Sequence, residues 1–353
     1  MREVRPGPQS LSIVLAAHDE AALIGGSIGA LATLGRPIYI IADHCTDDTA
    51  RLAAAAGARV YERTEGEGGK GAALAWFMEV AEAELRGLDA LIVLDADSRL
   101  APGFVEAMAC AFARGAQAAQ GFVQPVGVGP SPVAALAAYS ELLSQRIGDK
   151  IRSALGWTVP LRGTGMAFRP HLLREVVKGL RTRTEDIELS LRLARRGMRV
   201  WWVPGAVMFD PKPQGMQRAA NQRARWLQGQ AQVWRYYGRD ILRLLLTGGP
   251  NAWSLLWALL LKPKTLVAAA KVALLALLAL LPIRPPVLHW ALLGLVLLGV
   301  AADAVYYLAG LLLVNERGVY ARALLAAPLY ALMWLWSLLL APVARRTWLR
   351  ARD

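Results

Sequence analysis

The chain has 353 residues, of which 55% are hydrophobic, 19% are charged and 2 are cysteines. The apolar fraction excludes an intrinsically disordered chain, and two cysteines are too few for a disulfide framework or a cysteine metal cluster. The net charge of +13 fits either nucleic acid or an anionic membrane surface with anionic substrates. We favour the membrane surface with anionic substrates, because the basic residues flank apolar segments and the sequence shows no recognisable nucleic-acid-binding motif.

Apolar residues are concentrated toward the C-terminal end. Residues 250–353 hold ten Lys and Arg, three Asp and Glu, and half of the 12 tryptophans. The first ten residues are polar and lack the pattern of a signal peptide, so we expect the globular part to stay in the cytoplasm. We therefore predict a cytoplasmic globular domain (1–213), interfacial amphipathic helices (214–263) and a transmembrane region (264–353).

In chain order, the first third alternates short apolar runs with helical patterns. Strands are predicted at 11–17, 37–42, 58–61, 90–94 and 116–122, and helices at 21–34, 71–86 and 102–114. Unbroken apolar strands alternating with helices predict an α/β domain with a parallel sheet covered on both faces. Ligands of such sheets bind at the carboxyl ends of the strands. Further helices are predicted at 132–151 and 183–197, and a basic, Trp-bearing amphipathic helix at 214–246.

Three apolar stretches follow, at 265–281, 287–314 and 320–342. Each is long enough, or nearly so, to cross a hydrocarbon core of about 30 Å, so we predict about three spans. The positive-inside rule asks for the cytoplasm at both ends of this region, which three crossings cannot satisfy. The basic residues concerned are Lys262 and Lys264 at one end and Arg345, Arg346, Arg350 and Arg352 at the other.

One carboxylate, Asp303, lies inside the second apolar stretch. Such residues are rare within membranes and are usually functional. The alternative is that Asp303 faces a neighbouring helix or a wet cleft.

Two carboxylates, Asp95 and Asp97, come directly after the apolar strand 90–94. Oxygen ligands on the loop leaving a buried strand suit Mg²⁺ or Mn²⁺ held against a diphosphate. The alternative is the cap of a following helix, because short Asp motifs commonly cap helices.

Two other loops offer groups for a nucleotide. Asp43 follows the strand 37–42 and could accept hydrogen bonds from a bound base. Residues 68–71 (GGKG) open a helix, where backbone N–H groups and Lys70 could bind an anion. The spacing is not that of a P-loop, and an ordinary turn is the alternative.

The last candidates lie on two helices. Glu185 and Asp186 begin the helix 183–197, as a general base or as ordinary partners of the helix dipole. On the amphipathic helix, Arg225 could bind a diphosphate through two hydrogen bonds and Trp226 could stack on a sugar. The alternative is a membrane-surface helix with basic and aromatic residues.

Together these segments form an ordered set of motifs. The set resembles the membrane-bound inverting glycosyltransferases of family 2, which include the cellulose, chitin and hyaluronan synthases and ceramide glucosyltransferase. The resemblance covers about residues 10–240. It is carried by LSIVLAAHDE (11–20), ADHCTDDT (42–49), GGKG (68–71), DAD (95–97), GTGMAFR (163–169), TED (184–186) and QRARW (222–226).

The resemblance implies a GT-A fold, which is Rossmann-like, and a role for each matching position. The nucleotide-sugar would contact Ala17, Glu20, Asp43, Lys70 and Asp95. The divalent metal, Mg²⁺ or Mn²⁺, would be held by Asp97 with Asp95. The catalytic base would be Asp186, with Glu185 beside it. The diphosphate and the acceptor would contact Gly163, Thr164, Gly165, Gln222, Arg225 and Trp226.

The resemblance also implies the reaction. An acceptor hydroxyl would attack the anomeric carbon while the nucleoside diphosphate leaves from the opposite face, with inversion and a transition state like that of glycoside hydrolysis. We expect a UDP-sugar donor, a lipid or lipid-linked glycan acceptor, membrane lipids as partners, no nucleic acid, and a multi-pass location in the inner cell membrane. The alternatives are a processive polysaccharide synthase and an inactive nucleotide-binding scaffold.

Overall fold

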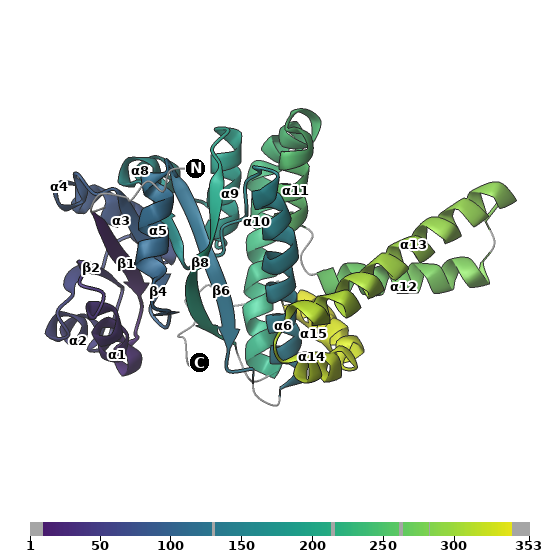
Figure 1. The fold of residues 1–353 in the computed structure, drawn as a ribbon, viewed down its shortest axis with the longest axis horizontal. Helices are drawn as coiled ribbons and strands as arrows, with labels where there is room; N and C mark the ends of the chain where they lie inside the picture. Colours follow the sequence, from purple (N-terminus) through teal and green to yellow (C-terminus); the bar gives the residue numbers. More distant parts are fainter. Residues whose placement is uncertain (1–9, 129–130, 213–215, 261–263, 282, 341–353) are drawn as a thin grey trace.

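Figure 1 shows the computed structural model, which describes residues 10–128, 131–212, 216–260, 264–281 and 283–340. Some predicted features lie outside the described residues. They are the polar N-terminal segment, the two ends of the interfacial region at 214–215 and 261–263, and the end of the third apolar stretch with the basic tail from Arg345 to Arg352.

An eight-stranded mixed sheet forms the N-terminal domain, in the order β3-β2-β1-β4-β7-β6-β8-β5. Strands β1 to β4 are mutually parallel, as predicted. The expectation of a wholly parallel sheet is wrong for the half of the sheet formed by β5 to β8. There, β7 runs antiparallel to both β4 and β6, and β5 runs antiparallel to β8. The strands are Leu11–Ala17 (β1), Ile38–Asp43 (β2), Arg59–Arg63 (β3), Ala90–Asp95 (β4), Arg99–Leu100 (β5), Ala118–Val126 (β6), Met166–Phe168 (β7) and Val200–Pro211 (β8).

Helices cover both faces of the sheet, which explains the unbroken apolar strands. Along β1, Ile13 and Leu15 belong to one buried cluster and Val14 and Ala16 to the other. The first cluster is covered by α1 (Ala21–Ala32), α2 (Thr49–Ala55) and α5 (Phe104–Ala113). The second is covered by α3 (Lys70–Val80), the short α4 (Glu82–Leu85), α8 (Pro170–Val177) and α9 (Glu185–Arg195). The α/β sheet domain is thus confirmed.

A second layer of helices stands beside the sheet (Figure 1). The predicted helix 132–151 is α6 (Pro132–Leu143), which continues as a π-helix over Ser144–Asp149 and then α7 (Lys150–Ala154). The predicted amphipathic helix is α10 (Met216–Thr247), followed by α11 (Gly249–Leu260).

The C-terminal helices form two groups. Helices α12 (Lys264–Leu280) and α13 (Pro286–Gly310) make a hairpin that projects away from the domain (Figure 1). A short 3-10 turn (Leu311–Leu313) leads to α14 (Arg317–Leu324) and α15 (Ala327–Leu340).

Within the described residues, one helix is long and apolar enough to cross a membrane, Pro286–Leu313, with a mean hydropathy of 2.0 and none of its apolar window buried. A second crossing is counted only if α14 and α15, which meet at 65°, form one broken span. The predicted straight stretch 320–342 is therefore two helices. They pack on α6 and α10, so part of their apolar surface is explained by burial against the domain.

The intramembrane candidate Asp303 faces its neighbour in the hairpin. Its Oδ2 accepts a hydrogen bond from Lys271 Nζ at 2.6 Å, and the same ammonium lies 3.4 Å from the Gly299 carbonyl. The structure thus shows the alternative in which Asp303 faces a neighbouring helix.

Candidate functional site

The site lies where β1, β2 and β4 end, because the carboxyl ends of parallel strands meet at one edge of the sheet. Ala17 and Asp43 end β1 and β2, and Asp95 ends β4. Ala17 is buried, and its carbonyl accepts a hydrogen bond from the Cys45 thiol at 3.5 Å. The backbone of the equally buried Glu20 is tied to Thr49 Oγ1 at 2.7 Å.

Lys70 connects four of the sequence motifs. Its Nζ donates to Asp95 Oδ1 at 2.5 Å and to the Gly163 carbonyl at 2.6 Å, and it lies 3.8 Å from Glu185 Oε1. Burial favours the neutral form of this amine, but the surrounding carboxylates Asp95 and Glu185 raise its pKa above the ordinary value. Lys70 is therefore a fixed, buried positive charge at the centre of the site.

The acidic pair on α9 lies against this lysine. Burial raises the pKa of Glu185 to about 7; Lys70 opposes the rise, and Asp186 and Asp95 add to it. Asp186 Oδ1 accepts a hydrogen bond from the backbone N–H of Ile187 at 2.9 Å, in the first turn of the helix. Both carboxyls are thus in the same electrostatic environment as Lys70 and Asp95.

The second aspartate of the DAD motif is surrounded by other acids. Burial raises the pKa of Asp97 to about 7, with further contributions from Asp95, Asp210 and Glu20. This concentration of carboxyl groups is the kind of donor set that binds a hard divalent cation.

The GTG loop is held firmly beside Asp95. Thr164 Oγ1 accepts from the Asp95 backbone N–H at 3.1 Å, and its carbonyl accepts from Gln120 Nε2 at 3.0 Å. Gly165 has a φ of 64°, and a Cβ there would lie 2.5 Å from Met208 Sδ. Only glycine fits at this position, so the motif is also a requirement of the backbone.

Asp43 is placed differently from the expectation that it accepts hydrogen bonds from a bound base. Its side chain is fully buried, and its oxygens accept from Arg63 Nη1 at 2.5 Å and from the Gly69 N–H at 2.8 Å. Gly69 itself has a φ of 136°, a conformation that favours glycine. In this structure Asp43 thus anchors the GGKG loop that carries Lys70.

The side chains of the QRARW motif on α10 differ in burial and in their neighbours. Arg225 is largely buried, and this burial, together with Arg183, lowers its pKa; Glu185 opposes the shift. Gln222 is half-buried and Trp226 is 46% exposed. Arg223, which the sequence analysis did not select, is only 2% exposed.

Arg223 connects α10 to the C-terminal helix α15. Its Nη1 donates to the Ala219 carbonyl at 2.7 Å and its Nη2 to Tyr330 Oη at 3.1 Å. Its guanidinium also lies over the rings of Tyr330 and Trp334, at 5.2 and 5.3 Å. Arg223 is therefore a structural residue, whereas Arg225 of the same motif belongs to the electrostatic surroundings of Glu185.

Close packing brings α10 against the TED motif. A Cβ on Gly229 would lie 2.4 Å from Thr184 Cγ2. Beside it, Arg183 is held by Gln228 and Gln232, the latter accepting from the Arg183 backbone N–H at 3.0 Å. The small residue is what allows the QRARW helix to approach the acidic pair.

Sequence reasoning missed a group at the end of β8. Lys212 contacts Glu141 and donates to Asp210 Oδ2 at 2.5 Å, and Asp210 is one of the acids that raise the pKa of Asp97. It also missed Arg162, next to the GTG loop, which pairs with the buried Asp149. The position of Asp210 directly after an apolar run was the available signal.

A separate cluster of possible metal ligands comprises Asp19, Cys45 and Asp47. Its carboxylates already accept hydrogen bonds within the loops: Asp19 Oδ1 from the Thr46 N–H at 2.6 Å, and Asp47 Oδ1 from the Thr49 N–H at 3.0 Å. The first of these bonds joins the loop after β1, which carries Asp19, to the loop after β2, which carries Cys45 and Asp47.

Comparison with known proteins identifies the family to which the chain belongs. The model of glycosyl transferase family group 2 matches residues 90–344. No curated protein matches the chain.

Two solved structures are similar over part of the chain. One is a crystal structure of a mycobacterial protein, with 24% identity, 62% of this chain and 74% of that chain covered, and a TM-score of 0.39. The other is glucosyl-3-phosphoglycerate synthase from Mycobacterium tuberculosis in complex with Mn²⁺, UDP-glucose and phosphoglyceric acid, with 22% identity, 62% and 79% covered, and a TM-score of 0.41. Both TM-scores are below 0.5, so neither structure supports an argument about function.

Proposed function

The chain belongs to glycosyl transferase family group 2, and from this premise we propose that it transfers a sugar, with inversion, from a nucleotide sugar to a hydroxyl of a lipid or lipid-linked glycan. UDP-sugar is the expected donor. The observation that supports the proposal most is the position of Lys70, which contacts Asp95, the Gly163 carbonyl and Glu185. One lysine thus contacts the residues proposed for donor binding (Asp95), for the acceptor (Gly163) and beside the base (Glu185).

Asp95 and Asp97 fit a divalent cation, Mg²⁺ or Mn²⁺. Carboxylate oxygens are the ligands these ions prefer. The pKa of Asp97 is raised first by its burial and then by the neighbouring carboxylates, so a bound cation would stabilise its charged form. When bound, the cation would supply electrostatic stabilisation of the leaving diphosphate. The chain's own cations, Lys70 and Arg225, would add to that stabilisation.

We assign the catalytic base to Asp186, with Glu185 as its neighbour. Asp186 is a carboxylate in the first turn of α9, at the end of the helix where the dipole favours negative charge. It can then accept the proton of an acceptor hydroxyl. Glu185, which lies against Lys70, would hold that lysine in place.

We propose that the protein is attached to the inner cell membrane, with the sheet domain on the cytoplasmic side. Helix α13 supports this, because 28 residues from Pro286 to Leu313 have a mean hydropathy of 2.0 and none of their apolar window is buried. Such a surface is unfavourable in water and matches a hydrocarbon core. How many times the chain crosses stays a prediction.

The test is transfer itself. Membranes containing the full chain are given each nucleotide sugar together with extracted host lipids, and products are identified by mass. We expect one sugar added to a lipid with a UDP-sugar, and a loss of about 100- to 10,000-fold for Asp186→Asn.

The other outcomes separate the alternatives. A ladder of long polymers would indicate a processive synthase. Nucleotide binding without turnover would indicate an inactive scaffold. Purely soluble products would contradict the lipid acceptor, and unchanged transfer by Asp186→Asn would contradict the choice of base.

A further inference from the structure

One row of side chains on α10 is apolar and yet exposed. Residues four apart lie along one side of a helix, and in this row Trp234 is 50% exposed, Leu242 56% and Leu246 76%. The row one position earlier is buried against α9 and α11 and consists of Val233, Tyr237 and Ile241. Packing among the described residues therefore accounts for the buried row and leaves the exposed row uncovered.

Helix α11 extends this apolar surface. The indole N–H of Trp253 donates to the Leu245 carbonyl at 2.6 Å, which brings the ring to the end of α10. Trp257 lies one turn further along α11, and the two tryptophans are 55% and 56% exposed. Indole rings favour the boundary between lipid and water, because they combine a large apolar ring with a polar N–H. The exposed residues of the two helices form the outer apolar face: Trp234, Leu242, Leu246, Trp253 and Trp257.

A row of arginines borders the outer apolar face. Arg235, Arg239 and Arg243 are all exposed, and they recur every four residues, one position after the apolar row. Such side chains cover apolar surface with their stems while their charges stay in water or among headgroups. This arrangement of apolar and basic rows is typical of a helix that lies in the interface of an anionic membrane.

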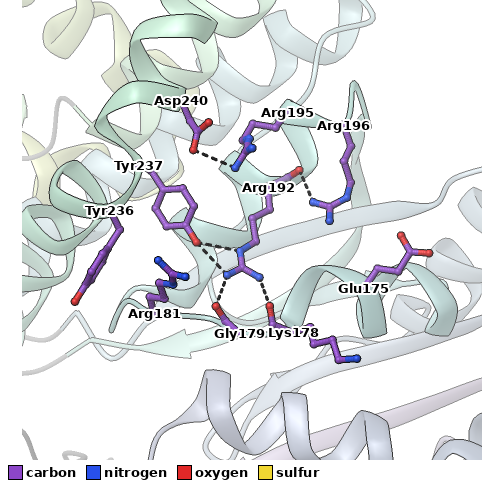
Figure 2. Close-up of a pocket in the computed structure, with 10 residues that line it drawn as sticks. All are labelled: Glu175, Lys178, Gly179, Arg181, Arg192, Arg195, Arg196, Tyr236, Tyr237 and Asp240. Carbon is purple, nitrogen blue, oxygen red and sulfur yellow. Dashed lines mark hydrogen bonds and ion pairs between the residues drawn. The ribbon is translucent and has the colours of Figure 1, made fainter.

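The side of α10 that faces away from the apolar row is polar. Tyr236 and Asp240 lie two positions after the apolar row, and residues two apart point to nearly opposite sides of a helix. They line a groove of about 580 Å³ between α8, α9 and α10 (Figure 2), where Asp240 pairs with Arg195 at 3.0 Å. Helix α10 thus has a polar side toward the sheet domain and an apolar side away from it.

The hairpin gives the direction of a membrane relative to these helices. Helix α11 ends at Leu260, and α12 begins at Lys264. Figure 1 shows α10 and α11 packed side by side, with the hairpin of α12 and α13 leaving them at a wide angle. A hairpin that enters a bilayer lengthwise would therefore hold α10 and α11 along the surface of that bilayer.

We propose that the outer apolar face lies in the headgroup layer of an anionic bilayer, with α10 and α11 parallel to the surface. The inference rests on the membrane attachment of the proposed function and adds a second contact to that of α13. A bilayer fits this face better than a second copy of the chain does. Two copies joined here would bring two rows of arginines into one interface, whereas anionic headgroups would neutralise them. Because Arg225 belongs to the same continuous helix, this contact would also fix the height of the reaction centre above the lipid.

The experiment measures depth in the bilayer with spin labels on the full chain, reconstituted in vesicles of mixed phosphatidylglycerol and phosphatidylcholine. Cys45→Ser/Cys110→Ser first removes the two free cysteines. Leu242→Cys and Trp257→Cys then place a label on the outer apolar face, and Tyr236→Cys, on the same helix and 46% exposed, is the matched control. Collisions are counted with oxygen, which dissolves in lipid, and with a nickel chelate, which stays in water. We expect the two face labels about 5–10 Å below the phosphates and the control label in water.

The other outcomes separate the levels of inference. Face labels that meet the nickel chelate as often as the control, in a chain that sediments with the vesicles, would overturn the surface contact alone. Face labels shielded from both reagents and broadened by a neighbouring label would indicate a second copy of the chain, which also overturns it. A chain that does not associate with the vesicles would overturn the membrane attachment itself. An unchanged melting temperature shows that a variant is folded, and Leu246→Cys replaces a face variant that is not.

The lipid composition tests the arginine row. In vesicles of phosphatidylcholine alone, we expect the label at Leu242 to lie closer to water, because the attraction between the arginines and anionic headgroups is lost. An equal depth in both kinds of vesicle would overturn the anionic character of the proposed surface.

Discussion

At the scale of single residues, the site depends on one buried cation among carboxylates. Lys70 has a side chain only 10% exposed and touches both Asp95 and Glu185. A buried cation with charged partners is stabilised by them, and removing it leaves like charges facing one another. In the proposed reaction, this one cation would therefore influence donor binding, the position of the GGKG loop and proton transfer.

Lys70→Met should lower kcat/KM about 100- to 1000-fold, the usual cost of removing one group that stabilises developing negative charge. Because Lys70 opposes the rise in the pKa of Glu185, that pKa should rise further in the variant. Initial rates with saturating acceptor measure the first effect, and titration of Glu185 by carboxyl NMR measures the second. Lys150→Met removes an exposed lysine and serves as the control; equal rates in the two variants would contradict the role of Lys70.

Asp97 makes a prediction about pH. With its pKa raised to about 7, protons compete with the cation below that pH, so the apparent affinity for Mn²⁺ should rise about tenfold per pH unit up to 7 and level off above it. Calorimetric titration of Mn²⁺ in the presence of UDP, at several pH values, measures this. Asp97→Asn should bind weakly at every pH, and persistence of the pH slope in that variant would show that another group is responsible.

The same carboxyl affects folding with a defined sign. Its pKa is higher in the folded chain than the ordinary 3.8, so the folded state binds the proton more tightly. Its contribution to stability is therefore present at low pH and is lost as the pH rises from about 4 to about 7. Without added metal, Asp97→Asn should melt at a higher temperature than the original chain at pH 8, and a lower melting temperature would contradict the buried, unpaired state of this carboxyl.

At the scale of elements, the approach of α10 to the TED motif depends on a glycine. Gly229→Ala places a Cβ 2.4 Å from Thr184 Cγ2, and overpacking of this kind costs about 1–3 kcal/mol. We expect a lower melting temperature and weaker transfer, because Arg225 moves with the helix. Gly238→Ala, on the same helix, meets nothing within 4 Å and should be neutral or stabilising. Comparable losses in both variants would mean that the close contact is unimportant.

The elements also show how far sequence reasoning reaches. Strands β1 and β4 were predicted nearly to the residue, because their apolar runs are continuous and bounded by polar loops. Strand β8 was missed, since Pro204 and Gly205 interrupt it, and its register with β6 shifts after Gly121. Strand β7 was missed because three residues carry no periodic signal, and its antiparallel direction depends on long-range pairing.

The site follows the same division. The resemblance carried by the ordered motifs predicts that Lys70, Asp95 and Glu185 share one site, and the structure brings their side chains together. The burial of Asp43 and the partners of Arg223 depend on side-chain packing between distant segments. Sequence spacing holds no information about such contacts.

At the scale of the whole molecule, the projecting hairpin contains one ion pair. Lys271 and Asp303 join α12 to α13 at 2.6 Å, each among mostly apolar neighbours in its helix. Lys271→Leu and Asp303→Leu each leave an unpaired charge, for which insertion scales give about 2.5–3.5 kcal/mol at a membrane centre. We expect reduced membrane yield and stability in each single variant and recovery in the double variant, measured by a double-mutant cycle in detergent. Additive losses would show that the pair is not coupled.

The two arginines of QRARW link the C-terminal helix α15 to the acidic pair on α9. Arg223 is clamped among the rings of α15, while Arg225, two positions along the same helix, belongs to the electrostatic surroundings of Glu185. A tilt of the C-terminal helix would therefore also displace Arg225 relative to Glu185. If the bilayer holds α15, as the proposed membrane attachment implies, its thickness would change the position of Arg225 beside Glu185.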